Sequence, residues 1–107
     1  MIARIWHGYT TPANADDYEK LLKQEVFPSI EEKQVKGYIG IQLLKRQLET
    51  EVEFTTIMFF EKLESVKLFA GESYELAYVP AKAQELLYRF EESSIHCEVI
   101  HELYYDR

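Results

Sequence analysis

Four segments of the chain alternate hydrophobic and polar residues with the period of two that predicts β-strands. They cover residues 2–10, 38–48, 52–60 and 95–103, and a short polar turn joins the second to the third, which predicts a hairpin. Pro12 ends the first strand, because proline cannot donate a hydrogen bond to a neighbouring strand.

Between the strands, apolar residues recur at steps of three and four, which predicts amphipathic helices. The longest helical region begins after Asn14, whose side chain suits a helix N-cap, and ends near Gly37. Pro28 lies within it and lacks a backbone N–H, so we expect a kink or break there. Shorter helices are expected over residues 63–70 and 81–90.

The order of these elements is strand, helix, strand, strand, helix, strand, which predicts a ferredoxin-like split βαβ domain of the α+β class. Such a domain has a four-stranded antiparallel sheet with helices on one face only. The chain has 107 residues and no linker or low-complexity segment, so residues 1–107 are expected to form a single domain.

Both faces of the predicted sheet are apolar. In the third strand, Phe54 and Met58 point to one face, and Ile57 and Phe59 point to the other. The helices cover one of these faces, and the chain is too short to supply a second covering layer. The sequence therefore predicts a homodimer in which two copies pack face to face through their sheets.

The charge balance narrows the partners. Acidic residues number 19 and basic residues 12, so the net charge is −7, and neither a nucleic acid nor an anionic membrane is an expected partner. We expect the isolated basic residues to form local ion pairs or to be solvated: Arg4, Lys45, Arg46 and Lys82. Cys97 is the only cysteine, so no internal disulfide and no cysteine-rich metal site are expected. The lone thiol and the lack of an apolar leader indicate a cytoplasmic protein.

Five segments, taken in order, resemble the antibiotic biosynthesis monooxygenase family and cover nearly the whole chain. They are Trp6-His7-Gly8, Gly40-Ile41-Gln42-Leu43-Leu44, Phe54-Thr55-Thr56-Ile57-Met58-Phe59-Phe60, Phe69-Ala70-Gly71-Glu72-Ser73-Tyr74 and His96-Cys97-Glu98-Val99. The resemblance implies a dimeric α+β barrel, in agreement with the element order. It also implies oxidation of an electron-rich aromatic substrate by dioxygen, with no metal or flavin cofactor. In such a reaction the protein supplies a dry pocket and a proton acceptor.

Two residue patterns of characterised family members are not matched. Anthraquinol-type members resemble a pattern with Asn within the third strand and Trp at its end, where this chain has Thr56 and Phe60. Heme-degrading members need an Asn on the first strand and a His ahead of the last strand. The first strand here has no Asn, and residues 61–95 contain no His, so heme cleavage is not expected.

We expect the candidate site between the sheet and residues 71–80, where the covering helices are shortest. A histidine titrates near neutral pH, so His96 is the first candidate for a catalytic proton acceptor, with Tyr74 beside it and His7 as the next candidate. The expected substrate-binding residues are Trp6, Thr56, Phe60, Phe69 and Tyr78. The alternative for the histidines is a structural role as half-buried strand residues, and for the phenylalanines a place in the core. The spacing of the three histidines does not favour a metal site.

Two functions stay open on the sequence. The first, implied by the resemblance, is a cofactor-independent monooxygenase or quinol oxidase acting on a small aromatic substrate. The alternative is a non-catalytic dimeric module that binds a small ligand. Thr56 and Phe60 favour the module, whereas the polar-edged aromatic set that includes Trp6, Tyr74 and His96 favours the enzyme.

Overall fold

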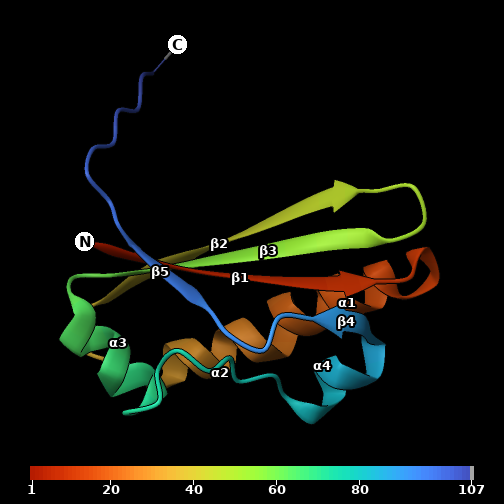
Figure 1. Ribbon diagram of the computed structural model, residues 1–107, viewed down its shortest axis with the longest axis horizontal. Coiled ribbons are helices and arrows are strands. Elements are labelled where there is room, and N and C mark those ends of the chain that lie inside the picture. Colours follow the sequence, from red (N-terminus) through yellow and green to blue (C-terminus); the bar gives the residue numbers. More distant parts are fainter. Residues whose placement is uncertain (107) are drawn as a thin grey trace.

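The computed structural model describes residues 1–106 and contains one antiparallel β-sheet with helices on one of its faces (Figure 1). The strands lie in the order β2–β3–β1–β4, and β5 pairs with the other end of β1. This is the strand order of a ferredoxin-like fold, so the predicted α+β architecture is confirmed. The bounds of the strands are Ile2–Thr10 (β1), Tyr38–Gln47 (β2), Val52–Phe60 (β3), Leu87–Phe90 (β4) and Ile95–Glu98 (β5).

The strands β4 and β5 are two parts of one interrupted strand beside β1. β4 pairs with residues 8–10 of β1, and β5 pairs with residues 2–5. The expectation of a helix over residues 81–90 is therefore wrong in its second half, because helix α4 (Ala81–Leu86) ends where pairing with β1 begins. The last strand is also shorter than expected. β1 begins at Ile2, so residues beyond Val99 have no strand segment to pair with.

The first helical region changes its winding ahead of the proline. It consists of η1 (Pro12–Asn14), α1 (Ala15–Leu21), the π-helical segment η2 (Leu22–Val26) and α2 (Phe27–Glu32). Pro28 has no N–H to donate to the carbonyl oxygen of Gln24, and the wider π-helical segment lies directly ahead of it. The predicted interruption therefore takes the form of a change in helix type. Asn14 precedes α1, but its side chain donates to the carbonyl oxygen of Leu86 instead of capping the helix.

Helix α3 (Leu63–Ala70) has the predicted bounds and ends at Gly71, whose positive φ of 87° suits glycine. Residues 71–80 follow without a regular helix and cross the helical face of the sheet toward α4. No helix within residues 1–106 is long and apolar enough to cross a membrane.

The core beneath the helices is divided into two clusters. The first lies at the α1 and α4 end and consists of Ala15, Tyr18, Leu21, Leu22, Val52, Phe54 and Ala83. The second lies at the α3 end and consists of Met58, Phe60 and Val66, with partly buried neighbours that include Ile30, Ile41 and Phe69. The space between these clusters is the place where a small molecule could lie against the sheet.

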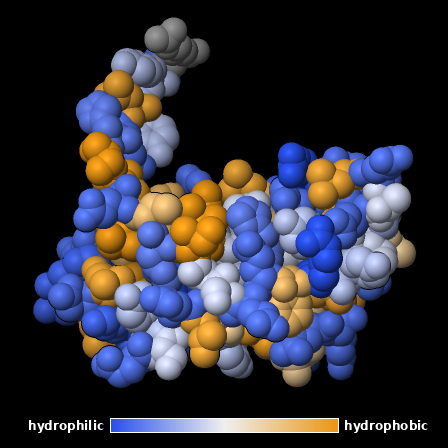
Figure 2. All heavy atoms as spheres, in the orientation of Figure 1, coloured by the Kyte–Doolittle hydropathy of each residue, from blue (hydrophilic) through white to orange (hydrophobic). Residues whose placement is uncertain are grey.

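The other face of the sheet is uncovered (Figure 1). The strand register places six residues in two adjacent rows on it, which we call the sheet patch: Ile57, Ile5 and Ile95 in one row, and Phe59, Ala3 and Cys97 in the next. Residues 100–106 leave the body on this side of the sheet, and Ile100 and Leu103 are exposed along them. Figure 2 shows hydrophobic side chains on this tail and on the body at its base. The predicted apolar character of both sheet faces is therefore present.

Candidate functional site

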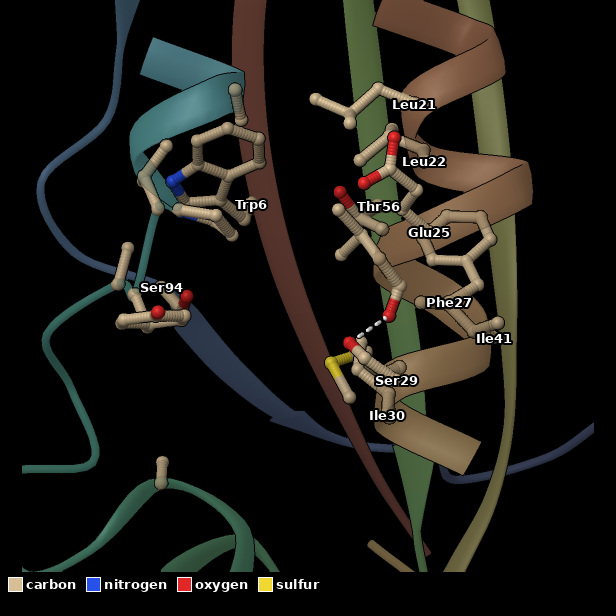
Figure 3. Close-up of a pocket in the computed structure, with 18 of the residues that line it drawn as sticks. Trp6, Leu21, Leu22, Glu25, Phe27, Ser29, Ile30, Ile41, Thr56 and Ser94 are labelled. Atoms are coloured by element: carbon tan, nitrogen blue, oxygen red, sulfur yellow. Dashed lines mark hydrogen bonds between the residues drawn. The ribbon is translucent and has the colours of Figure 1, made fainter. Parts of the chain in front are cut away.

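A cavity of about 710 Å³ lies between the sheet and the helices (Figure 3). Its floor is formed by β1, β2 and β3, one wall by η2 and α2, and the other wall by Phe69, Ala70 and residues 76–83. A cavity of about 150 Å³ holds one benzene, so this space admits a ligand of two or three aromatic rings. The lining is mostly apolar, and its aromatic side chains are Trp6, Tyr18, Phe27, Phe69 and Tyr78.

Strand alternation determines which side chains reach the floor of the cavity. Arg4 and Trp6 of β1 lie opposite Met58 and Thr56 of β3 in the antiparallel register. Residues two apart in a strand share a face, so all four side chains lie on the helical side of the sheet. In Figure 3 the indole of Trp6 lies toward α4, whereas Thr56 lies toward the first helical region.

Trp6 is held in a defined position. Its indole Nε1–H donates to the carbonyl oxygen of Glu91 at 2.7 Å, and its ring lies 6.2 Å from the ring of Phe90. Gly8 leaves room for this ring, because a Cβ at position 8 would lie 2.6 Å from an indole carbon. The part of the floor that Trp6 provides is therefore fixed before any ligand binds.

Arg4 is the most deeply buried basic side chain that lines the cavity, with 5% of its surface exposed. Its guanidinium donates to the carbonyl oxygens of Tyr74 and Leu76, and so ties residues 71–80 to the sheet. It also donates to Nε2 of His96 at 2.9 Å. A guanidinium has donors only, so Nε2 of His96 carries no proton in this contact.

His96 contacts Arg4 on the side away from the large cavity and does not line that cavity. It lines a second depression together with Tyr74, whose ring stands edge-on at 5.2 Å from the imidazole. Burial lowers the pKa of the His96 imidazole, and the neighbouring Arg4 guanidinium lowers this pKa further, against a smaller opposing effect of Glu75. The imidazole is therefore neutral at neutral pH and acts here as a hydrogen-bond acceptor.

No family model matches this sequence, and no curated protein matches it. Solved structures do match along nearly the whole chain. A Bacillus cereus protein provisionally named an antibiotic biosynthesis monooxygenase superposes with a TM-score of 0.64 at 9% identity, covering 99% of this chain and 97% of that one. The heme degrader MhuD from Mycobacterium tuberculosis, solved with two hemes in its active site, superposes with a TM-score of 0.59 at 18% identity, covering 96% and 99%.

The chain has the fold of the antibiotic biosynthesis monooxygenases. The resemblance stated from the sequence is thereby confirmed for the fold. The names of the two solved proteins indicate different reactions, so the shared fold does not determine the activity. The activity therefore has to be inferred from the residues that line the cavity.

Four of the residues expected to bind substrate line the large cavity. Trp6 and Thr56 lie on the floor, Phe69 lies in the wall, and Tyr78 lies at the rim with 80% of its surface exposed. The cavity also borders residues 76–80, within the segment expected from the sequence. The cavity is lined by the sheet face that the helices cover. The sequence did not determine which of the two faces this would be.

The other expected site residues lie elsewhere. Tyr74 and His96 line the second depression, and Phe60 is fully buried in the second core cluster. His7 lies on the uncovered face of the sheet, where its Nδ1 is 2.7 Å from a carboxylate oxygen of Glu91. The sheet separates His7 from the cavity, whereas Tyr74 and His96 adjoin it through Arg4, which lines the cavity and hydrogen-bonds to both.

The expectation for Arg4 is wrong. Three of the isolated basic residues do form local ion pairs: Lys45 with Glu19, Arg46 with Glu53 and Lys82 with Glu25. Arg4 is neither solvated nor paired with a carboxylate among residues 1–106, because its strand position turns it under the helices.

The cavity also contains charged residues that sequence reasoning missed. Glu25 and Lys33 line it from the first helical region. The signal that could have found them is the helical spacing, which places them beside the apolar residues Leu22 and Ile30 on the same side. In the described part of the chain, no three His, Cys, Asp or Glu side chains gather as metal ligands would.

We expect His96 to make the folded protein less stable in mild acid. The pKa of His96 is lower in the folded protein than in the unfolded chain, so the unfolded chain takes up the proton first as the pH falls. The stability that neutral His96 contributes is present above about pH 6.5 and is lost as the pH falls through the folded-state pKa. Between about pH 7.5 and about pH 5.5, the Tm of the wild type should fall by about 1–3 °C more than the Tm of His96→Gln.

His101→Gln is the matched control for this measurement, since His101 lies in the exposed tail. Its Tm should follow that of the wild type across the same pH range. Equal losses of Tm in the wild type and in His96→Gln would contradict the assignment of a lowered pKa to His96.

Proposed function

We propose that this protein is a cofactor-independent oxygenase, of the monooxygenase or quinol-oxidase type, that acts on a small aromatic substrate. The observation that carries the proposal is the cavity of about 710 Å³ with five aromatic side chains in its lining. Its position between the sheet and the helices covers a bound ring from two sides and leaves it open at the Tyr78 rim. The shared fold with a protein provisionally named a monooxygenase supports the proposal.

The proposed chemistry needs few protein groups. In the oxidase reaction, a quinol gives two electrons and two protons to dioxygen, and the products are a quinone and hydrogen peroxide. In the monooxygenase reaction, a ring methylene becomes a carbonyl with one oxygen atom, and the other oxygen atom leaves as water. Both reactions begin more easily from the deprotonated substrate, so the protein has to hold the ring and accept a proton.

We place the proton acceptor at Glu25. Glu25 is the only carboxylate among the described residues that line the cavity, and no histidine lines it. Its Oε1 atom accepts a hydrogen bond from Lys82 at 3.0 Å, and the carboxylate lies at the solvent-exposed side of the lining. His96, the acceptor expected from the sequence, is the competing candidate, and it would have to act from behind Arg4.

The proposal is tested by oxygen uptake with a panel of quinols, naphthols and anthrones. One of these should be consumed with saturable kinetics, and Glu25→Gln should lower the turnover number by about 10²-fold. His96→Gln should change the turnover number by less than about threefold. A large loss in His96→Gln with full turnover in Glu25→Gln would instead make His96 the acceptor, with Tyr74 beside it.

A non-catalytic module that binds a small ligand is the second candidate. It is favoured by the pairing of Glu25 with Lys82, which occupies the one carboxylate of the described lining. Calorimetric titration with the same panel separates the two functions. Tight saturable binding of a panel member without any oxygen uptake would identify the module.

We infer that the protein acts as a homodimer joined through the sheet patch. The patch is apolar, and the helices lie on the opposite face of the sheet. The tail leaves the body on the side of the patch and carries exposed Ile100 and Leu103. A second copy of the chain would cover both features at once, because an isologous contact brings the same surface to each side.

A further inference from the structure

The cavity contains a buried positive charge that no carboxylate of residues 1–106 pairs with. The guanidinium of Arg4 is 5% exposed, and every ion pair between described residues involves other side chains. Buried charges in folded proteins are normally paired, because an unpaired charge loses its hydration without compensation. Arg4 is thus the one group of the cavity whose charge calls for a partner from outside the chain.

The neighbours of Arg4 position the guanidinium without neutralising it. Its hydrogen bonds go to the carbonyl oxygens of Tyr74 and Leu76 and to Nε2 of His96, and they use three of its five N–H groups. All three acceptors are uncharged, since burial and Arg4 itself lower the pKa of His96. Burial lowers the pKa of the Arg4 guanidinium, but arginine stays protonated in proteins, so its charge is uncompensated and two N–H donors remain for a ligand.

A second basic residue lies at the same end of the cavity. The Lys33 Nζ atom is 5.0 Å from the centre of the Phe69 ring, and the Arg4 Cζ atom is 6.0 Å from the same centre. Glu25, the sole acid of the described lining, is engaged by Lys82. The Phe69 end of the cavity is therefore positive in a protein whose net charge is −7.

We propose that the cavity takes an aromatic acid, with its carboxylate on Arg4 and its ring system against Trp6. The planar guanidinium fork matches a carboxylate in geometry and charge, and Lys33 adds attraction at longer range. The aromatic side chains of Trp6, Phe27 and Phe69 in the lining suit the flat ring system. This inference rests on the proposed function and narrows its substrate from any small aromatic molecule to an anionic one.

The first test compares two probes that differ only in charge. 2-Naphthoate carries a carboxylate, and 2-naphthamide is a neutral molecule of nearly the same shape. Calorimetric titration of the wild type should show at least about tenfold tighter binding of 2-naphthoate. Trp6 is the only tryptophan, so the shift of its indole N–H signal in NMR spectra reports whether each probe enters the cavity.

Three variants test which basic residue causes the preference for 2-naphthoate over 2-naphthamide. Arg4→Gln keeps hydrogen-bond donors but loses the charge, so it should bind both probes with similar affinity. Lys33→Gln, at an exposed position, should lower the preference for 2-naphthoate by about threefold. Lys36→Gln loses the same charge at an exposed position outside the cavity lining, and it should leave the preference unchanged.

The outcomes separate this inference from the proposed function. Equal affinities of the wild type for the two probes, with a shifted Trp6 signal, would overturn the aromatic acid and leave the aromatic cavity standing. Equal weakening of both probes in Arg4→Gln would show that Arg4 only fastens residues 71–80, and would also overturn it. If Arg4→Gln does not fold, the wild-type comparison and Lys33→Gln decide. An unshifted Trp6 signal with both probes would count against the proposed function itself.

Discussion

Replacing Ile57 by Glu should convert the protein from a homodimer into a monomer. Ile57 is the member of the sheet patch on β3, between Ile5 on β1 and Gln42 on β2. In a face-to-face dimer each copy of this side chain would be buried against the sheet of the partner. Two unpaired carboxylates at that place would lose their hydration without compensation, which costs several kcal/mol per charge.

Light scattering at micromolar concentration measures the result directly. The wild type should have twice the chain mass of 12.7 kDa, and Ile57→Glu should have the chain mass itself. Leu68→Glu is the matched control, because Leu68 is exposed on α3 and lies outside the sheet patch. This variant should remain dimeric. A wild-type protein that is monomeric under these conditions would contradict the dimer proposal.

The architecture could be predicted because the strand patterns are unambiguous. The alternation places Arg4 and Trp6 on one face of β1, and the register shows that Thr56 of β3 lies on the same face of the sheet. The segment 87–90 could not be assigned in this way. Leu86, Leu87 and Phe90 fit the spacing of a helix, and only the pairing with β1, which is distant in sequence, favours a strand.

The sequence allowed the aromatic lining of the candidate site to be predicted, but not which charged residues lie in it. Aromatic residues flanking an irregular segment indicate a cavity wall, and Phe69 and Tyr78 do line one. Whether Arg4 finds a carboxylate depends on where each acidic residue lies in space. Glu91, for example, lies near the same strand, but its carboxylate accepts hydrogen bonds from His7 on the opposite face. No local pattern carries that information.

The positions of Tyr74 and His96 illustrate the same limit. Both were expected at the polar edge of the cavity, Tyr74 because it lies within residues 71–80 and His96 because a histidine titrates near neutral pH. The backbone of residues 74–76 instead accepts hydrogen bonds from Arg4, which brings Arg4 to the cavity and leaves the side chains of Tyr74 and His96 in the second depression. Their catalytic role stays a prediction that the oxygen-uptake measurements test.

Phe60→Ala should destabilise the protein strongly, by about 3–5 kcal/mol in the free energy of unfolding. Phe60 is 0% exposed, and its ring lies 5.5 Å from that of Tyr38 and 5.8 Å from that of Phe69. The residue was expected to bind substrate, yet it lies in the second core cluster and does not line the cavity. Its removal leaves a hole in the core, which the surrounding rings cannot close.

Phe69 offers the matched comparison, because the two rings touch and only Phe69 lines the cavity. Phe69→Ala, at a half-buried position, should cost less stability than Phe60→Ala and should weaken binding of 2-naphthoate by about tenfold. Phe60→Leu keeps most of the buried volume, so it should cost about 1–2 kcal/mol and bind 2-naphthoate with unchanged affinity. Urea unfolding and calorimetric titration of the three variants give both quantities. Loss of binding in a folded Phe60→Leu would mean that Phe60 takes part in ligand binding after all, through the ring of Phe69 that it supports.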